Sequence, residues 1–241
     1  MTFYSKTHKG LVRKKNEDSC YAPEHNNGFV AVVADGMGGH NAGEVASQIV
    51  IQTIRESLET KRPESITEED VKLAMALANK RVWDQANTDD SQKGMGSTAT
   101  LAVFTGKKTI IGHVGDSRAY LFRGRMLEQL TKDHSYVQIL IESGYITDEE
   151  ALHHPHRNII TRAIGTENEV DADVFSVSLS PGDTLLLCSD GLNNSVSDKK
   201  ISEILYSDAA AAADLLVEAA LLAGGTDNIS VVIAEMDGGT A

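Results

Sequence analysis

Short apolar runs with strand character alternate along the chain with amphipathic helical stretches and glycine-rich or charged turns. Residues 29–34 include no polar side chain and are β-branched at three positions, which predicts a strand that is buried on both faces. Residues 42–59 then carry apolar side chains at helical spacing. A second helix is predicted after Thr67, because Thr67 and Asp70 resemble a capping box that precedes the apolar positions 71, 74, 75, 78 and 82.

The middle of the chain has the pattern of antiparallel hairpins. Glycine-containing turns at residues 106–108 and at Gly124 separate apolar segments that read as paired strands. Further strands are predicted at residues 5–8, 18–22, 97–104, 109–114, 119–123, 125–130, 174–179, 184–189 and 229–235. Residues 134–165 break this rhythm with helical character at 136–143 and 147–152, which indicates an inserted flap.

Two more helices are expected near the C-terminus, at residues 198–206 and 209–223, and Gly224-Gly225 ends the second. Helices before and after the meander can cover both outer faces of a two-sheet sandwich. The predicted fold is therefore α+β, with four layers in the order αββα. Because no shift of composition divides the 241 residues, we expect one domain over residues 1–241.

Composition and charge exclude several classes of partner. The net charge is −13, whereas a protein that binds nucleic acid or anionic membranes is expected to carry a positively charged surface. Cys20 and Cys188 lie in strand-like segments and fit buried thiols of a reducing compartment. The first residues lack the apolar core of a secretory signal, and no run is long enough to cross a bilayer, so we expect a cytoplasmic location. The oligomeric state leaves no trace in the sequence, and a monomer is the default expectation.

Aspartates recur at the predicted strand ends. Asp35, Asp116 and Asp190 follow apolar strands, and Asp227 precedes one. An isolated Asp-Gly pair usually marks a turn, but antiparallel neighbours bring these four carboxylates to one sheet edge, where they repel one another unless cations lie between them. Oxygen ligands with no paired histidines favour Mg²⁺ or Mn²⁺ over zinc. Two such ions can activate a water for in-line attack on a phosphoryl group.

Six motifs occur in an order that resembles the metal-dependent type 2C Ser/Thr protein phosphatases in their compact bacterial form. They are Arg13-Lys14-Lys15-Asn16-Glu17-Asp18, Asp35-Gly36-Met37-Gly38-Gly39, Gly94-Met95-Gly96-Ser97-Thr98, Val114-Gly115-Asp116-Ser117-Arg118, Leu187-Cys188-Ser189-Asp190-Gly191 and Gly225-Thr226-Asp227-Asn228. The resemblance spans nearly the whole chain and implies a central antiparallel β-sandwich flanked by helix pairs.

The resemblance also implies a role for individual residues at two metal ions. Asp35 would bridge the ions, and Gly36 would offer its backbone carbonyl to one of them. Asp190 and Asp227 would bind the other ion, and Asp18 would hold a metal-bound water.

Four further residues follow from the same likeness. Arg13 resembles the phosphate-binding arginine, since its planar guanidinium suits two phosphoryl oxygens, and Glu17 would support the site from behind. Asp116 would bind an optional third metal, although a turn held by an Asp116–Arg118 contact explains the motif equally well. Asn228 is expected to fix a strand edge or a loop and not to bind a metal.

Met37 is a departure from the family pattern, because many eukaryotic members have a histidine there that is proposed as the general acid. His40, three residues on, could protonate the leaving alcohol, and metal-bound water could serve as well. The acid therefore stays open between these two.

The predicted function is hydrolysis of phosphoserine and phosphothreonine in proteins by a water activated at a dinuclear Mn²⁺ or Mg²⁺ centre. The enzyme is expected to counteract a Ser/Thr kinase. One alternative is a non-catalytic regulatory domain on the same fold, which loss of ligand carboxylates would mark. The other is a different metal phosphohydrolase, such as a nuclease or a small-molecule phosphatase.

Overall fold

Alternating side chains along the central strands divide the apolar residues between the two faces of each sheet. The computed structural model describes residues 1–24, 28–38, 42–207 and 209–237. In β3 (Val30–Met37), Val30 and Val32 join a core cluster with the helices, whereas Ala31 and Val33 join a second cluster between the two sheets. This two-residue period produces a layered core.

Two antiparallel sheets form the centre of the molecule. The first has the strand order β1-β11-β10-β7-β8 and the second β2-β3-β5-β6-β9, with β4 paired to β3. The bounds are β1 Thr2–His8, β2 Asp18–Tyr21, β4 Gly96–Ser97, β5 Ala99–Phe104, β6 Thr109–Val114, β7 Arg118–Arg123, β8 Met126–Gln129, β9 Asp173–Val177, β10 Thr184–Cys188 and β11 Ile229–Glu235.

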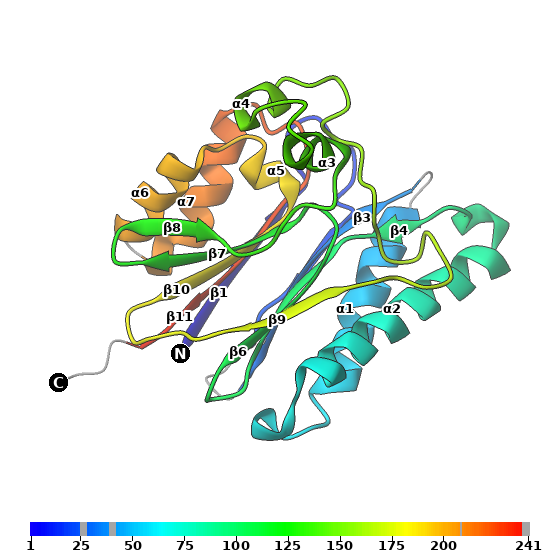
Figure 1. Cartoon of the computed structure of the whole chain (residues 1–241), viewed down its shortest axis with the longest axis horizontal. Coiled ribbons are helices and arrows are strands. Elements are labelled where there is room, and N and C mark those ends of the chain that lie inside the picture. The colour runs from blue at the N-terminus through cyan, green and yellow to red at the C-terminus, as the bar shows by residue number, and fades with distance from the viewer. Residues whose placement is uncertain (25–27, 39–41, 208, 238–241) are drawn as a thin grey trace.

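Helices cover the outer face of each sheet (Figure 1). Helices α1 (Ala42–Leu58) and α2 (Glu68–Thr88) pack on the sheet of β3, and α6 (Asp198–Ser207) and α7 (Ala209–Leu222) pack on the sheet of β11. Thr67 caps α2 through the predicted capping box with Asp70. The four-layer αββα arrangement predicted from the sequence is confirmed.

The segment between β8 and β9 contains α3 (Tyr136–Glu142) and α4 (Asp148–Ala151), close to the helical stretches predicted for the flap. Short 3₁₀ turns occur at Pro63–Ser65 and Asp90–Gln92. None of the helices in the described part of the chain combines the length and the apolarity that crossing a bilayer requires.

The structure corrects one local prediction. β3 does not end before Asp35 but continues through Gly36 to Met37, because Gly36 and Met37 pair with β4. Asp190 follows β10 as predicted and lies in the first position of a short helix, α5 (Asp190–Asn193), which was not predicted.

Candidate metal centre

Aspartates from both sheets meet at one end of the sandwich. Asp18 opens β2 and lies directly opposite Asp35 of β3 in the strand register. Burial raises the pKa of Asp35 well above its usual range, and the charges of Asp18, Asp190, Asp116 and Asp227 raise it further. The structure therefore brings together all five aspartates that the sequence predicted for the site.

Hydroxyl groups on neighbouring strands hold two of these aspartates in place. The Asp35 N–H donates to Thr98 Oγ1 at 2.8 Å, and Ser97 Oγ donates to the Asp35 carbonyl at 3.0 Å. Ser189 Oγ donates to Asp18 Oδ2 at 2.7 Å, and Ser189 in turn accepts from the Ser230 N–H at 2.9 Å. These contacts fix the backbone of Asp35 and the carboxylate of Asp18 before any ligand binds.

Three carboxylate oxygens of the cluster have the chemistry of metal ligands. Asp18 Oδ1, Asp116 Oδ1 and Asp190 Oδ1 are buried and have no hydrogen-bond partner. Burial, together with nearby acidic groups, raises the pKa of Asp18 to about 7 and that of Asp190 to about 6. Buried carboxylates without partners are costly unless they are protonated or bind a cation, so these oxygens fit a hard divalent metal.

The donor set is sparse. In the described residues, no three His, Cys, Asp or Glu side chains form a ready-made metal-binding group. Mg²⁺ and Mn²⁺ commonly retain several waters and use few protein carboxylates, whereas structural zinc sites are closed by four protein ligands. The buried oxygens of the aspartates are hard donors, which suit Mg²⁺ or Mn²⁺ better than zinc.

A close approach between β3 and the start of α1 places Gly36 beside this cluster. A Cβ atom on Gly36 would lie 2.0 Å from the Gly43 carbonyl oxygen, so no other residue fits without displacing the backbone. Glu17 occupies the same junction: its carbonyl accepts from the Gly36 N–H at 3.2 Å, and its carboxylate accepts from the Gly43 N–H. Burial is the main cause that raises the pKa of Glu17. Glu17 thus joins β3 to the start of α1.

Arg13 lies at the open side of the cluster. Its Nη2 donates to Asp227 Oδ2 at 2.7 Å, while about half of its side chain, 52%, is exposed to solvent. A guanidinium that is half exposed beside the carboxylates can bind the oxygens of an incoming phosphate.

Asn228 fixes the loop that carries Arg13. Its Nδ2 donates to the carbonyls of Lys9 at 2.9 Å and Lys15 at 2.8 Å, and its Oδ1 accepts from the Glu17 N–H at 2.8 Å. The side chain is only 5% exposed. The loop-fixing role predicted for Asn228 is therefore confirmed.

We expect Asn228→Ala to lower the free energy of unfolding by about 2–4 kcal/mol, because three main-chain groups would lose a partner in a buried setting. Urea unfolding of the metal-free protein measures this loss. Asn87→Ala is a suitable control, since Asn87 makes an exposed contact with its own helix and should change stability by less than about 0.5 kcal/mol. Equal effects of the two substitutions would show that the loop does not depend on Asn228.

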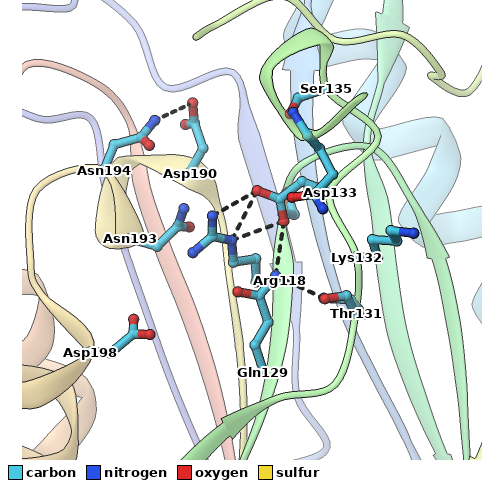
Figure 2. Close-up of polar contacts among 12 residues, drawn as sticks. Arg118, Gln129, Thr131, Lys132, Asp133, Ser135, Asp190, Asn193, Asn194 and Asp198 are labelled. Carbon is cyan, nitrogen blue, oxygen red and sulfur yellow. Dashed lines mark hydrogen bonds and ion pairs between the residues drawn. The ribbon is translucent and has the colours of Figure 1, made fainter. Parts of the chain in front are cut away.

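Arg118 does not bind Asp116, as one interpretation of the sequence expected. Instead, Arg118 Nε donates to Asp133 Oδ1 at 2.9 Å and Nη2 donates to Asp133 Oδ2 at 2.7 Å. Figure 2 shows this two-pronged pair, with Asn194 Nδ2 donating to Asp190 Oδ2 at 3.0 Å beside it. Asp116, whose pKa is raised first by burial and then by the charge of Asp190, keeps one carboxylate oxygen without a hydrogen-bond partner.

Sequence reasoning gave no role to several of these residues. Ser189, Thr98 and Asn194 hold the aspartates, and Asp133 holds Arg118. The available signal for Ser189 was its place directly before Asp190, and Thr98 has no aspartate beside it in the sequence. His40, the candidate acid, lies outside the described residues.

The fold and the site define an α+β sandwich protein with a carboxylate cluster suited to divalent cations and an arginine suited to phosphate. The sequence model of the family described as protein phosphatase 2C matches residues 5–218, and the chain belongs to this family. The serine/threonine phosphatase stp of Listeria monocytogenes is 38% identical over 239 residues, which cover 96% of this chain and 94% of that protein.

A relative from Mycobacterium tuberculosis and two solved structures, the first from the same organism, are also similar to this chain. The serine/threonine protein phosphatase PstP is 41% identical over 237 residues, and the match covers 98% of this chain but only 45% of that protein. A crystal structure of the PstP/Ppp phosphatase superposes with a TM-score of 0.92 at 40% identity and covers 98% of both chains. A structure of the PstP catalytic domain in complex with two manganese ions has a TM-score of 0.87 at 39% identity and covers 98% of both chains.

Proposed function

We propose that this chain is a metal-dependent phosphoprotein phosphatase that hydrolyses phosphoserine and phosphothreonine. The observation that carries the proposal is the set of buried carboxylate oxygens without partners, beside a half-exposed arginine. The relatives named as Ser/Thr phosphatases, and the PstP structure with two manganese ions, support it.

In this proposal, Asp35, Gly36, Asp190 and Asp227 hold two Mn²⁺ or Mg²⁺ ions, and Asp18 orients a water. When bound, the ions would supply activation of the attacking water and neutralise charge that develops on the phosphoryl oxygens. Asp116, with Asp190, could hold an optional third ion.

The chain's own residues position the substrate and the ligands. Arg13 can place two N–H donors against phosphate oxygens, and its contact with Asp227 keeps it at the cluster. Ser189 keeps Asp18 turned toward the site, while Thr98 and Ser97 keep the Asp35 backbone from moving as charge changes. His40 remains the proposed proton donor for the leaving alcohol, with water as the alternative.

Three finer parts of the proposal concern the cellular setting. The substrates are phosphoproteins, and a Ser/Thr kinase supplies them. The protein acts as a monomer in the cytoplasm, as a single catalytic domain with a flap at about residues 134–165. A regulatory domain without activity is disfavoured because each predicted ligand carboxylate is present in the described site.

The test is release of phosphate from a phosphothreonine peptide with Mn²⁺, with Mg²⁺ and with excess chelator. We expect turnover with either ion and a loss of at least about 10²-fold with chelator that added metal reverses. Folded protein that binds Mn²⁺ yet releases no phosphate from any phosphopeptide would favour the regulatory alternative. Hydrolysis of small phosphate esters alone would favour a small-molecule phosphatase.

A further inference from the structure

The N-terminal segment carries positive charge on an otherwise acidic chain. Residues 1–16 contain five of the 22 lysines and arginines and none of the 35 aspartates and glutamates, although the net charge of the chain is −13. Four of these five basic residues lie in the stretch 9–15, which we call the basic loop: Lys9, Gly10, Leu11, Val12, Arg13, Lys14 and Lys15.

The backbone of the basic loop is fixed directly against the candidate metal centre. Asn228 binds the carbonyls at both of its ends, and the Leu11 N–H donates to the Gly225 carbonyl at 2.7 Å. Gly10 has a φ of +78°, and a Cβ atom there would lie 2.1 Å from the Asp227 carbonyl oxygen. The loop is therefore a preformed surface whose side chains surround Arg13.

Several side chains of the basic loop face solvent. Lys9 and Lys14 are exposed, and within the described part of the chain no carboxylate forms an ion pair with either, whereas nearby Lys6 binds Asp214 at 2.7 Å. Leu11 and Val12 are 66% and 67% exposed. Cationic and apolar groups thus stand together at the rim of the site, as they do on surfaces that bind peptides.

We propose that the basic loop selects phosphopeptides with acidic residues flanking the phosphorylated serine or threonine, an inference that rests on the proposed phosphatase function. A phosphate bound at Arg13 places the peptide beside Lys14. An extended peptide advances about 3.4 Å per residue, so residues one to three positions from the phosphorylated one pass over the loop. On a strongly acidic protein, this positive rim is the side from which an anionic peptide is attracted.

The experiment compares two phosphothreonine peptides of equal length, one flanked by Asp and Glu and the other by Gln and Ala. In the wild-type protein with Mn²⁺, we expect kcat/KM to be about five-fold higher for the acidic peptide at low salt, with most of the difference in KM. Lys14→Glu should bring this ratio to one or below, and Lys9→Glu should lower it as well. At about 0.5 M salt the wild-type ratio should also approach one.

Lys199→Glu is the matched control, because it makes the same charge change on an exposed lysine of α6. It should keep the wild-type ratio. Equal kcat/KM for the two peptides in the wild type, or the same ratio in Lys14→Glu as in Lys199→Glu, would overturn this inference while the phosphatase function stands. Failure of the wild type to hydrolyse either peptide would overturn both.

Discussion

Replacing Asp35 by asparagine is expected to lower kcat/KM for a phosphothreonine peptide by at least about 10³-fold, which corresponds to about 4 kcal/mol of transition-state stabilisation. The charges of the other four aspartates all raise the pKa of Asp35, and in the proposed function Asp35 is the carboxylate that both ions share. An amide has nearly the same shape but no charge to hold them. Phosphate release at saturating Mn²⁺ measures the loss.

The backbone at this position should not move in the variant. Thr98 and Ser97 bind the main chain of Asp35 and not its carboxylate, so the amide introduced by Asp35→Asn would stand in the same place as the carboxylate. Asp84→Asn is a control with the same charge change on an exposed helix residue, and it should retain full activity. Calorimetric titration should show weaker Mn²⁺ binding only in the Asp35 variant. Turnover within about ten-fold of the wild type would remove Asp35 from the proposed metal ligands.

The sequence was sufficient to predict the layers, because the alternation of buried side chains along each strand depends only on the residues of that strand. In β10, for example, Leu186 packs toward the helices and Leu185 and Leu187 pack toward the other sheet. The capping box at Thr67 and the glycines after α7 likewise depend only on neighbouring residues. Each of these signals acts over a few residues, and each predicted element is present.

Pairing between distant segments could not be predicted in the same way. An Asp-Gly pair favours a turn, yet Asp35 and Gly36 remain in β3, because Asp35 pairs with Asp18 of β2 and Gly36 pairs with Ser97 of β4. Arg118 had an acidic neighbour two residues before it, but its partner is Asp133, fifteen residues on, which the β7–β8 hairpin brings back. Register decides both outcomes, and register is a property of the whole sheet.

The candidate site could be predicted in part. Strand-end positions were enough to predict that the aspartates meet, because antiparallel strands bring their ends to shared edges. The contacts that orient them depend on the folded structure: Ser189 binds Asp18 from a distant segment, and Asn194 binds Asp190 across the short helix α5. The role of each ligand remains a prediction that the metal-binding measurements test.

The clustered carboxylates should also make the stability of the metal-free protein depend on pH, and Asp18→Asn tests the contribution of one member of the cluster. Burial, with Asp190 and Asp227 nearby, raises the pKa of Asp18 to about 7 in the folded state, against about 4 in an unfolded chain. Between these values the folded protein binds more protons than the unfolded one, so its free energy of unfolding falls as pH rises. An asparagine side chain cannot ionise. The variant should therefore gain about 2–3 kcal/mol over the wild type between about pH 5 and pH 8.

Urea unfolding in chelator at the two pH values measures this difference. His113, whose pKa burial lowers to about 3, and His134 act in the opposite direction, but they are present in both proteins and cancel in the comparison. At the higher pH, saturating Mn²⁺ should make the wild type more stable to unfolding than Asp18→Asn, because the ion binds the folded wild type more tightly and stabilises it by mass action. A difference that stays constant with pH would mean that Asp18 ionises normally, and the carboxylate repulsion that points to a metal centre would then be absent at this residue.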